Sequence, residues 1–306
     1  MFEVEIAGEI YDIDGAKEYY NRYMKTSADW LNTGRKDWNK FYSSLTSLPE
    51  PVKFGTSGIR GVSALSDTPT LTPLNAYTLG VALSRISKKA VVGHDCRISG
   101  FAITSALVSG LMSGGCQVHY AGYISTGNIQ WSVRTTDADI GAMVTASHNP
   151  PPDNGIKVFG SDGIELSDEK TSEIQKNYLE IYNTFKPDGR PIDYMQSEIP
   201  EIAGDLLIID DRIKKTYIDR IKSVFSGSSD RLKRKMGDRC VVIDAGHSVG
   251  SMYVPYIFGD LNVFVIFGEM NGMFPGRQSE PTEDNLKRLL EIMPQKNAYL
   301  GFAIDG

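Results

Sequence analysis

The chain has 306 residues, a length that suggests two domains rather than one or four. Hydrophobic residues make up 41% of it, which fits a globular protein and excludes a disordered, collagen-like or coiled-coil chain. Thirty-two Lys and Arg against 38 Asp and Glu give a formal net charge of −6. We therefore expect no nucleic acid and no acidic membrane surface as a partner, because no general positive field attracts them.

The cysteines and the N-terminus indicate the cellular compartment in which the protein is expected. Cys96, Cys116 and Cys240 are far apart and form no C-x-x-C pair, which argues against a disulfide framework and a zinc cluster. Acidic residues follow Met1 in place of a secretory leader, and no apolar run is long enough to span a membrane. These features predict a cytoplasmic protein.

The first 50 residues differ in pattern from the rest of the chain. Aromatic side chains recur at helical spacing from about Ala16 to Leu45, and the segment ends at Pro49 and Pro51. The pattern predicts a helical N-terminal extension over residues 1–50, whose aromatic side chains most simply form a packed cap. A partner-binding face is the alternative interpretation.

Beyond this segment, short apolar runs alternate with helical patterns. Residues 90–93, 117–121 and 140–145 read as strands, and residues 103–112 read as a helix between the first two. Strand, helix and strand at this spacing predict a parallel unit. We place a first α/β domain at residues 51–195.

A second α/β domain is predicted over residues 205–306. It opens with an amphipathic helix at about 211–225, followed by a basic run at 231–235 that we interpret as a solvated helix end. Strands and helices then alternate from 240–244 to 299–304. In open α/β sheets ligands bind beyond the carboxyl ends of the strands, so the loops there are the candidate sites.

Thr145–Pro150 is the most informative of these loops. Ser147 leaves a buried strand on a Pro-rich turn, which holds its hydroxyl on a stiff backbone as a nucleophile or phosphoryl carrier requires. His148 does not form a hydrolase dyad with it, because neighbouring side chains of an extended chain point to opposite faces. From the residues alone, a simple turn serine is an equally good interpretation.

Three further places could hold an anion or move a proton. Phe54–Gly61 combines three glycines with the hydroxyls of Thr56 and Ser57 and the guanidinium of Arg60, a mixture suited to phosphate but also found in ordinary turns. Lys157 begins a strand soon after Ser147, where an exposed edge lysine is the simpler interpretation. Arg277 lies in a stiff loop whose simpler interpretation is a helix boundary.

Taken together, five segments resemble the α-D-phosphohexomutase superfamily, which includes phosphoglucomutases, phosphomannomutases and phosphoglucosamine mutases. The segments are Phe54–Gly61, Thr145–Pro150, Gly155–Lys157, Asp244–Gly250 and Pro275–Leu286. The resemblance implies consecutive α/β/α domains with mixed, mostly parallel sheets, of which this chain would hold the first two of four. Since Asp305 begins the family's metal loop, we expect a fragment that is inactive alone.

The resemblance also implies an activity, an intramolecular phosphotransferase (isomerase) that interconverts hexose 1-phosphate and hexose 6-phosphate. Mg²⁺ and glucose or mannose 1,6-bisphosphate would be its cofactor and activator. The implied roles are phosphoryl carrier for Ser147, acid/base for Lys157, charge stabiliser for Arg60, helper for His148, phosphate contacts for Thr56, Ser57 and Arg277, and metal ligands for Ser147 and Asp305.

Other readings stay open at this point. The sugar could be glucosamine, which would make the enzyme a phosphoglucosamine mutase. The chain could instead be a non-catalytic module that binds sugar phosphate or a partner, or a metal-dependent serine phosphatase that shares the phosphoserine intermediate. Hexose phosphates are the expected ligands, and self-association through a face left by a missing third domain is an expected possibility.

Overall fold

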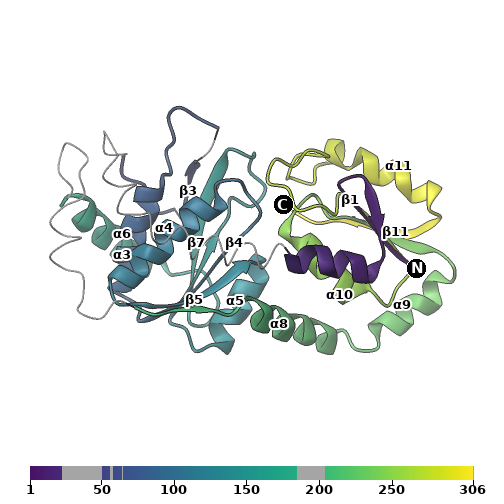
Figure 1. Ribbon diagram of the computed structural model, residues 1–306, viewed down its shortest axis with the longest axis horizontal. Helices are drawn as coiled ribbons and strands as arrows, with labels where there is room; N and C mark the ends of the chain where they lie inside the picture. The colour runs from purple at the N-terminus through teal and green to yellow at the C-terminus, as the bar shows by residue number, and fades with distance from the viewer. Residues whose placement is uncertain (23–49, 56–57, 64, 185–203, 306) are drawn as a thin grey trace. The chain divides into compact units, whose positions relative to one another are not determined.

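The computed structural model describes residues 1–22, 50–55, 58–63, 65–184 and 204–305 (Figure 1). They divide into two compact units, each with its own sheet. The first unit comprises the described residues of 26–146 and 152–213, and the second those of 1–25, 147–151 and 214–306. The predicted α/β fold, with mixed and mostly parallel sheets, is confirmed.

The first unit contains a six-stranded sheet in the order β3-β7-β6-β4-β5-β8. Its strands are β3 (Ile59–Val62), β4 (Lys89–His94), β5 (Gln117–Tyr123), β6 (Ile140–Val144), β7 (Asp153–Gly160) and β8 (Leu206–Ile208). Four of them, β4, β5, β6 and β8, run parallel, whereas β7 is antiparallel to both of its neighbours. Buried on both faces, β4 and β6 read as near-continuous apolar runs.

Helices cover this sheet, and each face has its own core. The helices are α3 (Pro73–Ser84), α4 (Gly100–Ser113), α5 (Thr126–Thr135) and α6 (Asp168–Tyr182). Ile156 and Val158 of β7 belong to the core that includes residues of α3, α4 and α6, and Phe159 belongs to the core that includes α5. Helices α3 and α4 approach closely because Gly80 and Gly110 lack side chains: a Cβ on Gly110 would lie 2.1 Å from the Tyr77 carbonyl.

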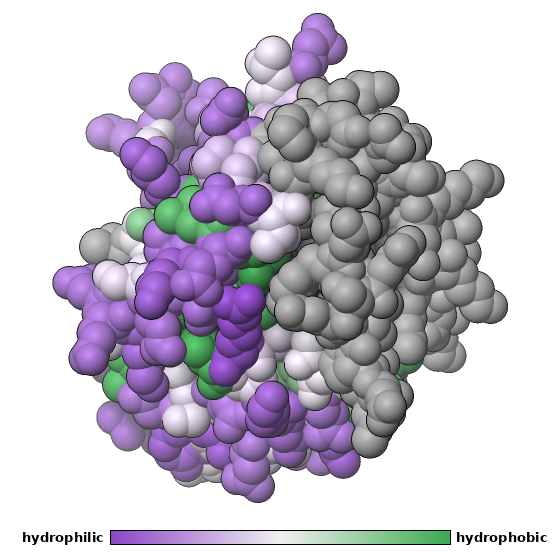
Figure 2. Space-filling view, turned by 90° about the vertical axis from the view of Figure 1, so that its left-hand side faces the viewer, coloured by the Kyte–Doolittle hydropathy of each residue, from purple (hydrophilic) through white to green (hydrophobic). Residues whose placement is uncertain are grey.

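The surface of the first unit agrees with this arrangement. Ile174, Tyr178 and Ile181 of α6 are buried at the spacing of one helix face, and the polar residues of that helix face outward. Figure 2 shows a mainly hydrophilic face among the described residues, with small, separate apolar patches.

The second unit contains a five-stranded sheet in the order β11-β9-β10-β1-β2. Its strands are β1 (Phe2–Ile6), β2 (Glu9–Tyr11), β9 (Cys240–Asp244), β10 (Val263–Ile266) and β11 (Ala298–Ala303). All but the edge strand β2 are parallel. Leu289 and Ile292 of α11 (Lys287–Gln295) pack on one face against Val242 and Ile266.

The predicted helical extension over residues 1–50 is wrong for the first residues of the chain, which form strands. Residues 2–11 are strands β1 and β2, and Phe2 and Val4 pair with Val263 and Val265. Residues 13–22 are helical as predicted, and the buried Tyr20 hydroxyl donates to the Gly268 carbonyl at 2.6 Å. The rest of the aromatic segment lies outside the described residues.

The boundary expected at residue 205 also differs. β8 pairs with β5, so residues 206–208 complete the first sheet rather than begin the second domain. The remaining elements are α8 (Asp210–Val224), α9 (Ser228–Met236), η1 (Val249–Tyr253), α10 (Val254–Phe258) and η2 (Glu283–Leu286).

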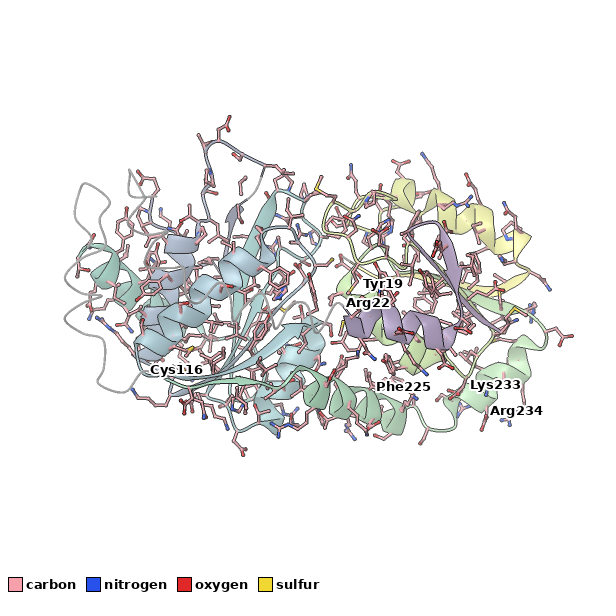
Figure 3. The ribbon with its side chains drawn as sticks, viewed as in Figure 1. Tyr19, Arg22, Cys116, Phe225, Lys233 and Arg234 are labelled. Atoms are coloured by element: carbon pink, nitrogen blue, oxygen red, sulfur yellow. The ribbon has the colours of Figure 1, made fainter. Side chains whose placement is uncertain are left out.

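The basic run forms the exposed side of α9, as predicted for a solvated helix end; Figure 3 labels Lys233 and Arg234 there. Among the described helices, none is both long and apolar enough to cross a membrane.

Candidate functional site

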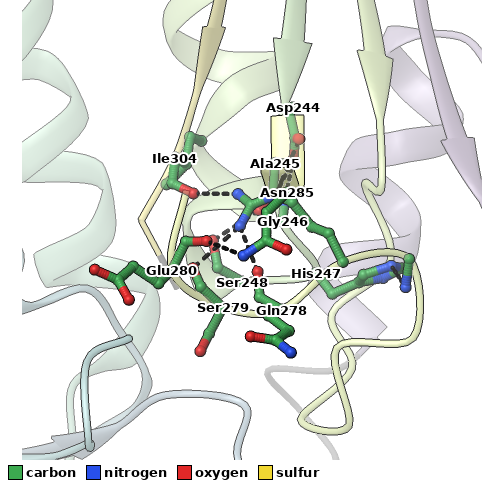
Figure 4. Close-up of polar contacts among 12 residues, drawn as sticks. Asp244, Ala245, Gly246, His247, Ser248, Gln278, Ser279, Glu280, Asn285 and Ile304 are labelled. Carbon is green, nitrogen blue, oxygen red and sulfur yellow. Dashed lines mark hydrogen bonds and ion pairs between the residues drawn. The ribbon is translucent and has the colours of Figure 1, made fainter. Parts of the chain in front are cut away.

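Strand β9 ends in a buried ion pair. The Asp244 carboxylate is fully buried, and Arg277 Nε donates to both of its oxygens at 2.9 Å (Figure 4). The Gly246 amide donates to Asp244 Oδ1, also at 2.9 Å. Burial raises the pKa of Asp244, while the guanidinium and the amide act against that rise.

Arg277 contacts several protein carbonyls in addition to Asp244. Its Nη1 donates to the carbonyls of Gln278 at 2.8 Å and Ser279 at 3.0 Å, and its Nη2 donates to the Ile304 carbonyl at 2.6 Å. The side chain is only 2% exposed. Every nitrogen of the guanidinium donates to a protein oxygen, so Arg277 holds loops and strand ends together, and its phosphate contact stays a prediction.

Asp305 lies beside the predicted phosphoserine loop. Ile304 continues β11 along β9 by donating its amide to the Asp244 carbonyl at 2.8 Å. The next residue, Asp305, has Oδ2 3.8 Å from His148 Nδ1, and both side chains are about half exposed. The structure therefore brings together two of the predicted site residues, His148 and Asp305, next to Ser147.

The backbone of Ser147 is in an uncommon conformation. Its φ is +57°, in the left-handed region that few residues other than glycine adopt. Ser279 holds the loop that follows: its Oγ donates to the carbonyls of His148 and Asn149, the latter at 2.9 Å. Strain of this kind, held by surrounding contacts, is a feature of functional sites.

His247 fixes a neighbouring loop as a neutral imidazole. Its Nε2 accepts from the Gly276 amide at 3.0 Å, so its proton must sit on Nδ1, which donates to the Glu269 carbonyl at 3.2 Å. Burial lowers the pKa of His247 and favours the neutral form. This histidine therefore has a structural role as a neutral imidazole.

The first sheet carries a comparable buried network beyond β4. The Asp95 carboxylate accepts from Arg97 Nε at 3.2 Å and from Thr145 Oγ1 at 2.6 Å. Arg97 Nη1 reaches the Asp153 carbonyl at 3.1 Å. Because Thr145 lies two residues before Ser147, this network holds the strand end that leads into the serine loop.

Arg60 and Lys157 lie on one face of the first sheet. Arg60 pairs with Gly155 across β3 and β7, and Lys157 is two residues further along β7. A Cβ on Gly155 would lie 3.1 Å from Arg60 Cγ and 2.8 Å from the Thr145 carbonyl, so glycine leaves the space that the arginine stem occupies. Thr56 and Ser57 lie outside the described residues.

Sequence reasoning missed Ser279, Arg97 and the role of Thr145. A hydroxyl in a loop has no periodic pattern to mark it, so nothing predicted Ser279. The sequence did contain a signal for the partner arginines. Asp95 and Asp244 each stand at the end of a buried strand, and a buried carboxylate requires a cation or several hydrogen-bond donors.

Comparisons with known proteins agree with this geometry. Two family profiles match, described as phosphoglucomutase/phosphomannomutase alpha/beta/alpha domain I over residues 51–185 and domain II over residues 215–306. The chain belongs to the α-D-phosphohexomutase superfamily. The predicted resemblance is thereby confirmed.

Curated relatives in this superfamily carry more than one name. A phosphoglucomutase/phosphomannomutase of Thermococcus kodakarensis is 34% identical over 258 residues, which are 83% of this chain and 53% of the relative. A phosphoglucosamine mutase of Brevibacillus brevis is 36% identical over 259 residues, with the same shares covered. The chain thus spans about half the length of the curated relatives it matches.

Solved structures show the same phosphohexomutase fold. A phosphoglucomutase/phosphomannomutase family protein from Burkholderia thailandensis matches with a TM-score of 0.62 at 23% identity, over 83% of this chain and 52% of that one. Parafusin from Paramecium, a phosphoglucomutase, matches with a TM-score of 0.64 at 19% identity, over 86% and 52%.

Proposed function

We propose that this chain is the phosphoryl-carrying part of a phosphohexomutase that interconverts hexose 1-phosphate and hexose 6-phosphate through a phosphorylated Ser147 and a bisphosphorylated sugar. The observation that carries the proposal is the setting of Ser147: a left-handed residue in a loop tied by Ser279, whose next residue, His148, lies 3.8 Å from the Asp305 carboxylate. The mutase names of the relatives support the reaction class.

The proposed reaction has two balanced transfers. In the first, the free hydroxyl oxygen of a hexose phosphate attacks phosphorus on phosphoserine, the bond from phosphorus to Ser147 Oγ breaks, and the hydroxyl proton leaves as Oγ regains one. The sugar is then a bisphosphate. In the second, Ser147 Oγ loses its proton and attacks the other phosphate, the bond from phosphorus to the sugar oxygen breaks, and that oxygen gains a proton. Phosphoserine is restored and the isomeric monophosphate is released.

Arg60 and Lys157 are the proposed charge stabiliser and acid/base of these steps. They lie on one face of the first sheet, on neighbouring strands, and Arg60 is exposed. A guanidinium offsets the negative charge on a transferred phosphoryl group, and a lysine can move the hydroxyl proton. His148 is the proposed helper at the serine loop, close to Asp305.

The residues present fit part of a Mg²⁺ site. Ser147 and Asp305 offer hard oxygen donors, which this ion prefers, and they lie in adjoining loops. In the described part of the chain no group of three or more His, Cys, Asp and Glu side chains is placed to bind a metal. Mg²⁺, when bound, would neutralise charge on the phosphate of Ser147.

The hexose is proposed only as a class. The relatives include a phosphoglucomutase/phosphomannomutase and phosphoglucosamine mutases, so glucose, mannose and glucosamine phosphates are all candidates. Comparing their 1,6-bisphosphates as phosphoryl donors to Ser147 would rank them.

The test is the mass of the intact chain with peptide mapping of Ser147. Incubation with glucose 1,6-bisphosphate and Mg²⁺ is expected to add one phosphoryl group at Ser147, and the Ser147→Ala variant is expected to gain none. Sugar monophosphate should appear in equal amount. Release of inorganic phosphate instead would indicate a serine phosphatase, and an unmodified Ser147 with all three bisphosphates would favour a non-catalytic binding module.

A further inference from the structure

Ser279 is a buried hydroxyl with two partners in a distant segment. It is 2% exposed, and its Oγ donates to the successive carbonyls of His148 and Asn149, which are about 130 residues earlier in the chain. One hydroxyl proton is thus shared between two acceptors, and the hydroxyl faces protein rather than solvent. Because its proton is engaged by these two carbonyls, the contact that it supplies is to the loop that follows Ser147.

The same short segment is fixed at its other end. Arg277 is anchored on the buried Asp244, and its Nη1 donates to the carbonyls of Gln278 and Ser279. Its Nη2 donates to the carbonyl of Ile304, the residue before Asp305. Residues 277–279 therefore contact both the segment that follows Ser147 and the residue that precedes Asp305.

We propose that residues 277–279 form a tie that sets the separation between Ser147 and Asp305, with Ser279 as a positioning residue for the phosphoryl carrier. The functional meaning of this tie rests on the proposed mutase activity. Ser279 holds the serine loop, Arg277 holds the end of β11, and the backbone between them is clamped by the same guanidinium.

The backbone of Ser147 explains why such a tie is needed. A serine at φ +57° is strained, and this conformation persists only where neighbouring contacts fix it. If the carbonyls of His148 and Asn149 lost their donor, the loop could relax and displace the Ser147 hydroxyl. A misplacement of about 1 Å can cost on the order of a hundredfold in rate, because phosphoryl transfer depends on position.

The experiment compares backbone order in the 306-residue chain and two serine variants. Ser279→Ala removes the tie. Ser132→Ala is the matched control, since Ser132 is also fully buried and its Oγ donates to a carbonyl, that of Asn128 at 2.6 Å in α5. Amide order parameters from ¹⁵N relaxation are expected to fall from about 0.85 to below about 0.6 at residues 147–149 in Ser279→Ala alone.

Two results would overturn the tie. One is an unchanged order parameter at residues 147–149 in Ser279→Ala. The other is an equal fall in Ser132→Ala, which would mean general loosening. Ser279→Cys is a second variant, with a similar shape and a weaker donor. Its order parameters at residues 147–149 should lie between those of wild type and those of Ser279→Ala.

The rate of phosphoryl transfer separates this inference from the proposed function. With glucose 1,6-bisphosphate as the donor, Ser279→Ala should phosphorylate Ser147 at least about tenfold more slowly than wild type and Ser132→Ala. If wild type takes up no phosphate, the proposed function fails, and the order parameters still decide whether the tie exists. If wild type and Ser279→Ala react equally fast, the mutase proposal stands and the positioning role is wrong.

Discussion

Both sheets end a buried strand with an aspartate that pairs with a buried arginine, but the two pairs are built differently. Asp95 pairs with Arg97, two residues later in the same loop, through an Nε contact of 3.2 Å and the Arg97 amide at 3.0 Å. Asp244 pairs with Arg277, 33 residues later, through two Nε contacts of 2.9 Å. A nearby histidine, His94 or His247, accompanies each pair, buried and engaged by protein groups.

The difference lies in what each pair holds. Arg97 Nη1 reaches the Asp153 carbonyl, and Asp95 also accepts from the Arg97 amide and the Thr145 hydroxyl. Arg277 connects three parts of the second unit: the end of β9, its own loop and the end of β11. The Asp95–Arg97 pair lies within one loop, and its further contacts to Thr145 and Asp153 span 50 and 56 residues. In the second network the ion pair itself joins two loops, 33 residues apart.

Removal of the two arginines should therefore have unequal effects. Arg277→Met leaves Asp244 buried with the Gly246 amide as its remaining donor, and should reduce the free energy of unfolding of the second unit by about 3–5 kcal/mol. Arg97→Met should cost the first unit less, because Thr145 still donates to Asp95. Native-state hydrogen exchange reads the two sheets separately.

A double variant checks the cause of this effect. Asp244→Asn together with Arg277→Met removes the uncompensated charge, so it should recover part of the stability lost in Arg277→Met alone. Equal losses for the two single arginine variants would contradict the idea that the donors left to each aspartate set the cost.

Both buried histidines, His94 and His247, should make the protein less stable as pH falls. His94 Nδ1 donates to the Asp95 carbonyl, Nε2 accepts from the Tyr120 hydroxyl, and burial lowers the pKa of His94 to about 4. The unfolded chain binds this proton near pH 6.5, so the contribution of His94 to stability is present above that pH. It is lost as pH falls, by about 3 kcal/mol at pH 4.

The measurement is the slope of unfolding free energy against pH for wild type and His94→Gln, which keeps a donor and an acceptor. The comparison is needed because burial also raises the pKa of Asp95 from its usual value of 3.8. A raised carboxyl pKa makes stability decrease as pH rises above that value, which is opposite to the effect of His94. The slope between pH 6.5 and 4 should be smaller in His94→Gln. Titration of the His94 ring by NMR near pH 6.5 would contradict this account.

Alanine substitutions at two glycines, Gly246 near Asp244 and Gly100 near Asp95, should give the smallest difference between the two networks. Gly246 has φ +58°, and a Cβ there would lie 2.3 Å from Arg277 Nη2, so Gly246→Ala should cost about 1–3 kcal/mol. Gly100 begins α4 with a nearest Cβ contact of 3.3 Å, to His94 Nδ1. Gly100→Ala should change stability by less than about 1 kcal/mol in either direction. Similar thermal midpoints for the two variants would show that the Asp244 region tolerates displacement.

The sequence predicted the elements whose signal is local. Strands β4, β6 and β9 were expected because buried parallel strands are continuous apolar runs. β1 was missed although Phe2, Val4 and Ile6 alternate with Glu3 and Glu5 as in a half-buried strand. Its parallel partner β10 lies near the other end of the chain, so its place in the sheet has no local signal. β8 was missed because three residues carry no period.

The site was predictable only where motif and strand end coincide. Ser147, His148 and Asp305 were identified as candidates from the sequence, and His148 and Asp305 do lie together. Arg277 was also identified, but its pairing with Asp244 was not, because a sequence does not say whether a guanidinium faces solvent or a buried aspartate. The partner of Ser279 is 130 residues away, so only the fold reveals it.

The place of β1 in the second sheet bears on the order of events during synthesis. β1 lies between β2 and β10, and its parallel pairing is with Val263, Phe264 and Val265. At the usual pace of translation, on the order of ten to fifty seconds separate the emergence of the two strands. The six-stranded sheet can close in that interval, while β1 must wait with its apolar side chains uncovered. A chaperone that shields β1 on the nascent chain would therefore assist formation of the second sheet, even though β1 is synthesised before any strand of the first sheet.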